Sequence, residues 1–344
     1  MSTIRDLAKS ARVSVGTVSR VLNGHPSVGP DIRERVEEAI RESGFRPNIR
    51  ARNLARGASG CIGFVVANRP VLQPFNAWLL NGVAQYCEER GYLVLFDRMQ
   101  YSPTSPLVAQ DLSRALRTDG AVDAVIVVGT NYPNLMECLD RLSICYVMVG
   151  NSFFVESAGV RTNQVRFDHF SGGRQAVEYL VQLGHRDIWY LGDLALPWYV
   201  ERYEGYCLAM QQAGLEPRAQ VEGLSDDRFL NGLHSAEIVL AQKQSVTAII
   251  GSTNEVAYGA WEAIERHGLH VPNDISLIGF DDEFTTHKSR PLTNVSVDPE
   301  EEGRQLARMA IIKIQSPGTK LPAVVIPAHL VRHSTCRPIL GSTT

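Results

Sequence analysis

The sequence predicts a small all-α domain followed by a larger α/β body that folds as two doubly wound parallel-sheet lobes. Residues 1–47 contain three short segments whose apolar residues recur at helical spacing. From Cys61 onward, short apolar runs alternate with segments of helical length, which is the pattern of parallel sheets with helices on both faces. The chain has 344 residues, of which 44% are hydrophobic, so it is long enough for more than one core.

Residues 4–11 and 15–22 predict the first two helices. Thr3 can cap the first helix, and Asp6 stands three residues later, as in a capping box. Ser14 can cap the second helix after a short break. The order is therefore helix, tight turn, helix. The apolar residues expected to face inward are Ile4, Leu7, Ala8, Ala11, Val18, Val21 and Leu22.

A third helix is predicted from Pro30 to the residue before Gly44. Proline is favoured in the first turn of a helix, and glycine can adopt the left-handed conformation that ends one. The core-facing residues of this helix are Ile32, Val36, Ala39 and Ile40. Three such helices form one small core. The second helix of such a unit enters the major groove of DNA, because that groove is wide enough for one helix.

The charge of the chain is divided unevenly. Residues 1–60 carry eleven Lys and Arg against six Asp and Glu, a local charge of +5, which leaves −8 for the remainder of a chain whose total is −3. An excess of basic residues at one end is typical of nucleic-acid binding. Ordinary solvated surfaces can carry a similar charge, so the prediction depends mainly on the helix pattern.

These segments resemble the headpiece of the lactose-repressor/galactose-repressor family of bacterial transcription regulators. The resemblance is carried by Thr-Ile-Arg-Asp-Leu-Ala at 3–8, Val-Ser-Val-Gly-Thr-Val-Ser-Arg-Val-Leu-Asn-Gly at 13–24 and Gly-Phe-Arg-Pro-Asn at 44–48. It implies a sequence-specific DNA-binding regulator, most often a repressor, that responds to a small molecule. One departure is Arg12, where the family usually has Gly or Asn. If its φ is positive, Arg costs on the order of 1 kcal/mol there.

The resemblance implies which headpiece side chains contact DNA. Val15, Gly16 and Arg20 take the positions that face bases. Arg20 can pair with O6 and N7 of guanine, which discriminates by roughly 1 to 3 kcal/mol, and Val15 can contact a thymine methyl group. The expected phosphate contacts are Thr3, Ser14, Thr17, Ser19, Asn23 and His25. The alternative for the hydroxyl residues on the second helix is that they only cap it and face solvent.

Residues 48–59 are expected to form a hinge helix and a linker. Without the resemblance, this basic segment is a linker that ends in Gly-Ala-Ser-Gly at 57–60. In the family, the stretch that matches residues 51–56 is a helix that orders on DNA and places its leucine between base pairs in the minor groove. The resemblance therefore implies DNA contacts for Ala51 and Leu54. A helix of about nine residues is too short to be stable alone in water, so it should form only with DNA and a partner hinge.

For the body, residues 60–340, the resemblance implies the type I periplasmic-binding-protein fold. It is carried by residues 171–173, 183–186, 201–206, 271–282 and 291–293. The predicted strands are residues 62–67, 92–96, 122–128, 144–149, 188–192, 248–251 and 276–280. Crossovers are expected near 163, 292 and 323, which gives an N-terminal lobe of about 60–163 and 293–322 and a C-terminal lobe of about 164–291 and 323–340. Ligands in such sheets bind at the carboxyl ends of the strands.

Four side chains are expected to form the core of an effector site. Arg202 and Asp281 match the two polar positions on which the family most often holds its effector, and Phe75 matches an aromatic residue of the N-terminal lobe. Trp198, four residues before Arg202, is expected to project into the same cleft. These groups suit a polyhydroxylated ring, which favours a sugar over a purine or another metabolite. The alternatives are that Arg202 and Asp281 simply pair across the cleft and that Trp198 belongs to the core.

Several cleft positions depart from the family pattern. Thr253-Asn254 replaces Asn-Asp after one strand, Phe167-Asp168 replaces Asp-Asn before the paired glycines, and Gly150-Asn151 stands where an acidic residue is common. Asn151 and Thr253 are still expected among the effector-binding residues. The identity of the effector, however, does not follow from the resemblance.

An enzyme is disfavoured, because the sequence contains no Gly-x-Ser-x-Gly elbow and no Walker-type phosphate loop. Asp281 and Asp282 are adjacent and usually point apart, and His267 and His270 lack a third metal ligand. We therefore expect no catalytic residues, no cofactor and no metal site. The six cysteines contain no Cys-x-x-Cys pair and are expected to be reduced packing residues.

The expected partners are a double-stranded DNA operator, a small-molecule effector and a second copy of the chain. A dimer places two recognition helices on the half-sites of a palindrome. The last residues contain no heptad pattern, and the choice between dimer and tetramer stays open. Because no leader peptide and no membrane-spanning run is apparent, a cytoplasmic location on nucleoid DNA is expected, and a secreted solute-binding protein of the same fold is disfavoured.

Overall fold

The structure is a computed structural model of the 344-residue chain. It describes residues 3–22, 25–45, 58–70, 74–152, 162–225, 227–242, 245–281 and 291–339. The chain separates into two compact units, Met1–Ser59, which contains the headpiece, and Gly60–Thr344, which is the body. Among the described residues, no helix is both long enough and apolar enough to cross a membrane.

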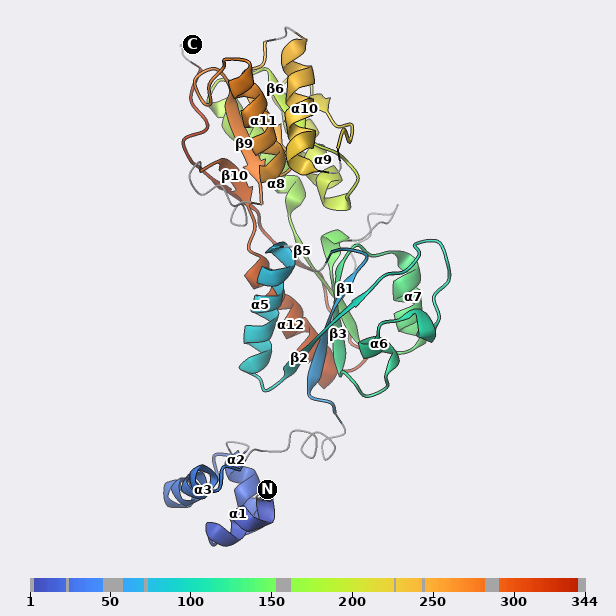
Figure 1. Ribbon diagram of the computed structural model, residues 1–344, viewed down its shortest axis with the longest axis vertical. Coiled ribbons are helices and arrows are strands. Elements are labelled where there is room, and N and C mark those ends of the chain that lie inside the picture. Colours follow the sequence, from blue (N-terminus) through green and yellow to red (C-terminus); the bar gives the residue numbers. More distant parts are fainter. Residues whose placement is uncertain are drawn as a thin grey trace. The chain divides into compact units, whose positions relative to one another are not determined.

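The headpiece is built from three short helices around one small core (Figure 1). They are α1 (Ile4–Ser10), α2 (Val15–Leu22) and α3 (Pro30–Ser43). Leu7, Val18 and Val36, one from each helix, are completely buried at its centre. Gly44 ends α3 in the left-handed conformation with φ 60°. The three predicted helices are thus confirmed, and each contributes to the same core.

Local caps fix where α1 and α2 begin. Thr3 Oγ1 accepts a hydrogen bond from the backbone N–H of Asp6, whose carboxylate accepts one from the N–H of Thr3, so the predicted capping box is confirmed. Ser14 Oγ accepts from the N–H of Thr17 at 3.1 Å. Arg12, in the turn between α1 and α2, has φ 52°, so it occupies the left-handed region expected at this position.

The N-terminal lobe of the body is a six-stranded parallel sheet with the order β11-β5-β4-β3-β1-β2. Its elements are β1 (Cys61–Ala67), α5 (Pro74–Glu88), β2 (Leu93–Met99), α6 (Arg114–Arg117), β3 (Ala124–Gly129), α7 (Pro133–Arg141), β4 (Tyr146–Val149), β5 (Gln164–Phe167), α12 (Pro299–Gln315), β11 (Val324–Ile326) and two 3-10 turns, η1 (Ala109–Asp111) and η2 (Gly150–Ser152). Helices α5 and α12 cover one face, and α6 and α7 cover the other (Figure 1).

Strand β1 shows how both faces are filled. Successive side chains of a strand point to opposite faces. Phe64 and Val66 therefore pack against α5 and α12, whereas Val65 and Ala67 pack against the layer formed by α6 and α7. The strand is apolar at almost every position because both of its faces are covered by helices.

The C-terminal lobe is a second six-stranded sheet with the order β12-β10-β9-β8-β6-β7, in which only the pairing of β10 with β12 is antiparallel. Its elements are α8 (His169–Gln182), β6 (Ile188–Leu191), α9 (Pro197–Gln212), β7 (Arg218–Gln220), α10 (Arg228–Ala241), β8 (Ala248–Gly251), α11 (Asn254–Arg266), β9 (Ser276–Phe280), β10 (Thr293–Ser296) and β12 (His329–Val331). Helices α8 and α9 cover one face, and α10 and α11 cover the other. The predicted architecture of two doubly wound lobes is confirmed.

The three crossings between the lobes lie later in the chain than the expected positions near residues 163, 292 and 323. Strands β5 and β11, expected in the C-terminal lobe, pair in the N-terminal sheet. Strand β10, expected in the N-terminal lobe, pairs with β9 and β12 in the C-terminal sheet. Each segment completes a short strand in the lobe that it leaves before it crosses, and so satisfies its buried backbone hydrogen bonds there. Each boundary between the lobes therefore lies one strand later in the chain than predicted.

Three pairs of neighbouring helices cross at glycines contributed by both partners. A Cβ atom added at any of these glycines would lie 2.0 to 2.1 Å from a carbonyl oxygen of the facing helix, so only glycine permits the observed approach. The glycines are Gly82 and Gly303 between α5 and α12, Gly173 and Gly205 between α8 and α9, and Gly232 and Gly259 between α10 and α11. The oxygen that faces Gly173 belongs to Arg202. This crossing therefore fixes where the Arg202 backbone lies.

Candidate functional site

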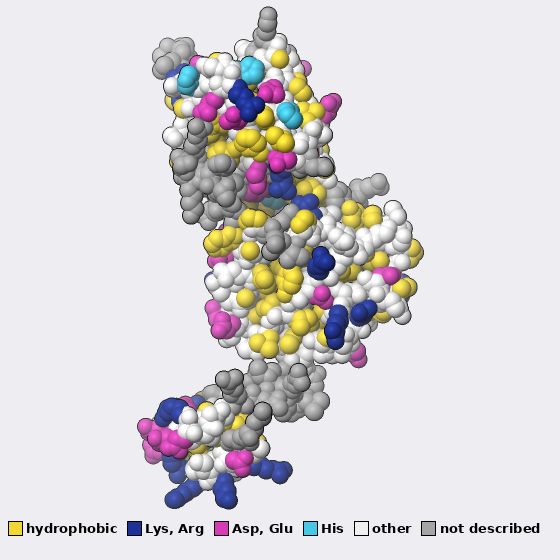
Figure 2. Space-filling view, viewed as in Figure 1, with side chains coloured by type: hydrophobic (Ala, Val, Ile, Leu, Met, Phe, Trp, Pro, Cys, Tyr) yellow, Lys and Arg dark blue, Asp and Glu magenta, His cyan; other side chains and the backbone are white. Residues whose placement is uncertain are grey.

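The predicted base-contacting residues of α2 lie on its exposed side. Val15 is 42% exposed, and Gly16 and Arg20 are also exposed, whereas Val18 faces the headpiece core. A Cβ atom added at Gly16 would meet only Ser14 Oγ, at an ordinary distance of 3.7 Å. The fold of the headpiece therefore does not itself require glycine at this position. Figure 2 shows Lys and Arg side chains projecting from the surface of this unit.

The predicted phosphate contacts are distributed around the same helix. Thr3, Ser14 and His25 are exposed, and Thr17 and Ser19 are partly buried. Ser14 caps α2 and is exposed at the same time, so capping and a phosphate contact are compatible. Three further predicted DNA contacts, Asn23, Ala51 and Leu54, lie outside the described residues. The DNA-contacting roles of all these residues stay predictions.

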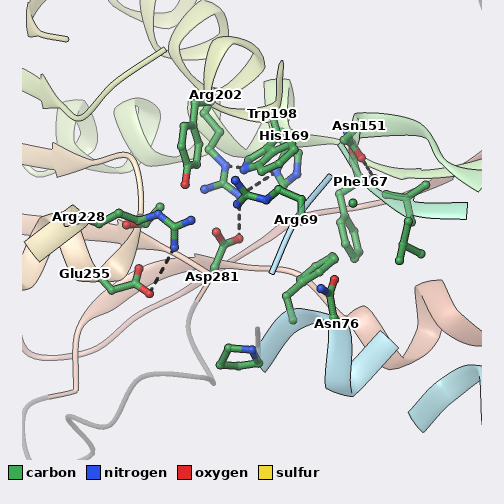
Figure 3. Close-up of a pocket in the computed structure, with 17 residues that line it drawn as sticks. Arg69, Asn76, Asn151, Phe167, His169, Trp198, Arg202, Arg228, Glu255 and Asp281 are labelled. Atoms are coloured by element: carbon green, nitrogen blue, oxygen red, sulfur yellow. Dashed lines mark hydrogen bonds and ion pairs between the residues drawn. The ribbon is translucent and has the colours of Figure 1, made fainter. Parts of the chain in front are cut away.

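A pocket of about 1000 Å³, including its open mouth, lies between the two lobes of the body (Figure 3). All six residues predicted to bind the effector line this pocket: Phe75, Asn151, Trp198, Arg202, Thr253 and Asp281. Side chains that the sequence did not single out also line it, notably Arg69, Asn76, His169, Tyr199, Arg228 and Glu255.

Arg202 is the most constrained side chain of the pocket. It is only 1% exposed, and its guanidinium donates hydrogen bonds to Asp281 Oδ1 at 2.7 Å, to the Ser252 carbonyl oxygen at 2.6 Å and to His169 Nδ1 at 3.3 Å. It also lies 4.7 Å from the centre of the Phe280 ring. A buried cation of this kind is stable because each of its sides has an acceptor or an aromatic face.

Asp281 presents the carboxylate of this pair to the pocket. Its side chain is 27% exposed, although Oδ1 is held by Arg202. The backbone is fixed at a φ of 65°, with its N–H bonded to the Val295 carbonyl and its own carbonyl accepting from the Asn254 amide. The expected alternative, an ion pair, does form, but it lies within the C-terminal lobe and does not cross the cleft. The Asp281 side chain therefore pairs with Arg202 and faces the ligand space at the same time.

His169 is neutral in the folded protein. Burial, together with the nearby positive charges of Arg202 and Arg166, holds its pKa well below the usual value of 6.5. Because Nδ1 accepts from Arg202, the remaining proton of the neutral ring must be on Nε2. The ring therefore supplies one more acceptor for the buried guanidinium without adding a second positive charge.

Two predicted effector residues are already engaged by the fold. The Asn151 amide donates to the Phe167 carbonyl at 3.1 Å and to Glu201 Oε2 at 2.9 Å, and its oxygen accepts from the Phe167 N–H at 2.7 Å. Thr253 is 2% exposed and caps α11 by accepting from the N–H of Val256. An effector that uses either side chain must displace one of these bonds. Their roles in effector binding stay predictions.

The aromatic side chains form two parts of the wall. From the N-terminal lobe, Phe75 packs edge to face on Phe167, with ring centres 6.2 Å apart. From the C-terminal lobe, Trp198 packs edge to face on Tyr199 at 5.6 Å. Trp198 is partly buried and lines the pocket, so it is not solely a core residue. Among the described residues, no group of three or more His, Cys, Asp or Glu could hold a metal ion.

Most residues missed by sequence reasoning share one kind of location. Five of them belong to the first turns of α5, α8, α9, α10 and α11, respectively: Asn76, His169, Tyr199, Arg228 and Glu255. In parallel sheets, the helix that follows a strand begins at the same edge at which the strand ends. The signal that could have found these residues was thus the first turn of each helix, in addition to the last residue of each strand.

Comparison with known proteins agrees with both parts of the chain. A family profile described as bacterial regulatory proteins, lacI family, matches residues 3–48, and one described as a periplasmic binding protein-like domain matches residues 177–336. The chain is 30% identical to the HTH-type transcriptional regulator CelR of Thermobifida fusca, over 96% of each protein. It is also 30% identical to the HTH-type transcriptional repressor PurR of Histophilus somni strain 129Pt, over 96% of this chain and 98% of that protein.

Solved structures resemble this fold over nearly its whole length. A complex of the transcriptional regulator CelR with cellobiose has a TM-score of 0.65 and 26% identity, covering 97% of this chain and all of that one. The lac repressor dimer bound to operator and the anti-inducer ONPF has a TM-score of 0.75 and 25% identity, covering 98% of this chain and 99% of that one. With a helix-turn-helix headpiece, a two-lobed body and relatives that match almost end to end, the chain belongs to the lacI family of bacterial regulatory proteins.

Proposed function

We propose that the protein is a DNA-binding repressor whose affinity for a palindromic operator is set by a carbohydrate bound between the lobes of its body. The observation that carries this proposal is the carboxylate of Asp281, tied to a buried arginine yet exposed in the pocket. The same chain also has the exposed face of α2, which is predicted to contact DNA. The similar CelR complex holds cellobiose, which supports a carbohydrate as the ligand class over a purine.

The chemistry of the pocket suits a polyhydroxylated ring. Asp281 Oδ2 is available to accept hydrogen bonds from sugar hydroxyls, while Oδ1 stays on Arg202. The aromatic faces of Phe75 and Trp198 can cover the C–H faces of a ring from opposite lobes. Because the Arg202 guanidinium is nearly inaccessible, it acts mainly by holding the Asp281 carboxylate in position.

A link between the lobes supplies a route from ligand to DNA. Glu201, on α9 of the C-terminal lobe, bonds Asn151 and forms a 2.9 Å ion pair with Arg166, both of the N-terminal lobe, close to the first crossing. Closure of the pocket must rearrange these bonds or rotate the lobes about them. In a dimer, a shift of the two N-terminal lobes would order or release the two hinge segments that carry Leu54. Such a regulator acts on nucleoid DNA in the cytoplasm.

The test is a mobility-shift assay with the full chain on palindromic DNA, with and without carbohydrates. Asp281→Asn keeps the side-chain volume but removes the ionised acceptor, so it should bind operator normally and lose the response to ligand. Leu54→Ala should bind operator weakly and still bind ligand. If the chain shows no salt-sensitive binding to any palindrome, or if the two variants behave alike, the proposal is wrong.

A further inference from the structure

Three arginines reach the pocket, and the function proposed above uses one of them. Arg202 is buried and fully paired, but Arg69 and Arg228 come from opposite lobes and have few partners (Figure 3). Arg69 follows β1 of the N-terminal lobe, and Arg228 is the first residue of α10 in the C-terminal lobe. Figure 3 shows both side chains extending into the pocket.

Arg69 is held in position but not neutralised. The preceding residue, Asn68, has φ 53°; its side chain accepts from the Tyr101 N–H at 2.9 Å and donates to the Thr130 carbonyl at 3.4 Å. These bonds fix the turn that directs Arg69 into the pocket. The partly buried guanidinium lies 5.7 Å from the centre of the Trp198 ring and forms no ion pair or hydrogen bond with any described residue. The fold thus orders a cation without supplying a carboxylate for it.

Arg228 has only a weak partner. Its guanidinium lies 3.9 Å from Glu255 Oε1, at the limit of an ion pair, and both side chains are more than a third exposed. Arg228 is the first residue of α10, and the N-terminus of this helix is already capped by the Asp227 carboxylate, which accepts from the Leu230 N–H at 3.0 Å.

The positive charge of Arg228 also acts on Arg69. Burial lowers the pKa of Arg69 and the charge of Arg228 lowers it further, against opposing effects of Tyr199 and Asp193. The pKa of Arg228 is raised, because Tyr199, Glu255, Asp281 and Asp193 together outweigh its burial. Among the described side chains that line the pocket, three arginines face only two carboxylates, Asp281 and Glu255, and the first of these is taken by Arg202. Among these lining side chains, positive charges therefore exceed negative ones by one, and Arg69 and Arg228 lie on opposite walls. Asp193, which is not part of the lining, also attracts both arginines.

We infer that the effector carries an anionic group, a phosphate or a carboxylate, which Arg69 and Arg228 hold from opposite lobes. This inference rests on the proposed function, since it names the class of carbohydrate that the pocket takes. Guanidinium groups donate paired hydrogen bonds to the oxygens of both anions. An anion between them replaces the repulsion of the two lobes by two attractions, and so favours the closed arrangement. Asp281 and the aromatic wall remain available for the rest of the ring.

The experiment measures ligand binding by calorimetry and thermal unfolding of the full chain. The probes are glucose and cellobiose as neutral sugars, glucose 6-phosphate and glucuronate as anionic ones, and inorganic phosphate as the anion alone. We expect an anionic sugar to bind at least roughly tenfold more tightly than the neutral sugars, and to bind more weakly as salt is raised. The phosphorylated sugar and the sugar acid distinguish the two possible anions.

Two variants and a control assign the effect to the arginines. Arg69→Gln and Arg228→Gln should each weaken binding of the anionic sugar by roughly tenfold to a hundredfold and leave the affinity for neutral sugars unchanged. Neither should lower the melting temperature of the ligand-free protein by much, because Arg69 has no ion pair with a described residue and Arg228 has only the exposed 3.9 Å contact with Glu255. Arg266→Gln is the matched control, since Arg266 pairs with Glu262 on the exposed side of α11, away from the pocket lining.

The inference is overturned if no anionic probe binds more tightly than its neutral counterpart, or if the two variants bind every probe as the wild type does. A marked loss of stability in the ligand-free variants would also contradict it, because it would assign the arginines to the fold. Failure of the proposed function is a different result: operator binding that no ligand affects in either the wild type or Asp281→Asn.

Discussion

The headpiece and the pocket are built in opposite ways. On α2, the side chains expected to contact DNA are exposed and make few bonds within the protein, as Val15, Gly16 and Arg20 show. In the pocket, the central polar groups are buried and bonded to the fold, as Arg202 and the neutral His169 show. A rigid double helix can order exposed side chains when it binds, whereas a small ligand must find its binding groups already in place.

Because of this difference, a substitution on α2 can affect function without affecting stability, whereas a substitution among the buried groups of the pocket affects both. Substitutions at the exposed positions of α2 are expected to remove contacts with DNA and to leave the headpiece core unchanged. Substitutions among the buried charges of the pocket leave their partners without hydrogen bonds inside the protein. The free energy of unfolding is therefore the quantity that tests the comparison.

The largest effect is expected for Arg202→Ala. The change leaves Asp281 and the Ser252 carbonyl without their buried donor, which should lower the free energy of unfolding by about 3 to 5 kcal/mol. Urea unfolding of the full chain measures it, with Arg266→Ala on the exposed side of α11 as the control. A loss below about 1 kcal/mol, comparable to a surface substitution, would show that the pocket is not tied to the fold as described.

The next effect is a dependence on pH through His169. Its folded pKa lies well below 6.5, so below pH 6.5 the unfolded chain takes up a proton that the folded protein does not. Stability should therefore fall as pH decreases from 6.5, by up to about 1.4 kcal/mol per pH unit.

Other buried groups also titrate, so the measurement is the difference between the wild type and His169→Gln in urea unfolding from neutral to acid pH. The advantage of the wild type should shrink steadily on acidification. A difference that does not change with pH would mean that His169 is not a neutral acceptor for Arg202.

A smaller effect of opposite sign is expected for Gly16→Ala. Alanine is favoured over glycine in a helix, and the added methyl group has room, so the headpiece should gain about 0.5 to 1 kcal/mol in stability. Binding to the operator should weaken, since the methyl group occupies the surface that faces bases. Thermal unfolding and mobility shifts measure the two quantities.

The matched change in the body is Gly173→Ala, whose Cβ would lie 2.1 Å from the Arg202 carbonyl and should lower stability. Equal responses of the two alanine variants would remove the contrast between the regions.

The smallest effect on stability is expected for Arg20→Ala. Because Arg20 is exposed and is not part of the headpiece core, its loss should change the free energy of unfolding by less than about 0.5 kcal/mol. Operator binding should weaken by roughly 1 to 3 kcal/mol, with relaxed preference at one base pair. Titration of operators that differ at single positions measures this. Unchanged affinity for every operator would place base recognition elsewhere on the headpiece.

Sequence patterns predicted the long and the capped elements well. Thr3 and Asp6 located the start of α1, and the strands at 248–251 and 276–280 appear with the predicted bounds. Strands β5, β7, β10, β11 and β12 were missed. Each has three or four residues, and all but β11 include polar side chains, whereas the equally short β6 and β8 are fully buried and apolar. The pairing of a short segment with polar residues is decided by the neighbouring strand. The misplaced crossovers have the same cause.

Sequence reasoning predicted one set of pocket residues and missed another. Phe75, Arg202 and Asp281 followed from residues next to recognisable motifs, and all line the pocket. His169 and Arg228 are separated by about sixty residues of chain and line the same pocket only because α8 and α10 begin at the same edge of one sheet. Spacing along the sequence does not reveal this proximity until the sheet order is known.

The paired glycines at the helix crossings have a consequence for how such a sensor can acquire new ligands. In each of the three crossings, two helices are spaced by contact between their backbones and not by side chains. The first turns that line the pocket therefore keep their places whichever side chains they carry. Exchange of Trp198 or Arg228 would alter the ligand without moving the helix that presents it. A library aimed at new specificity should hold the six glycines constant and vary the first turns.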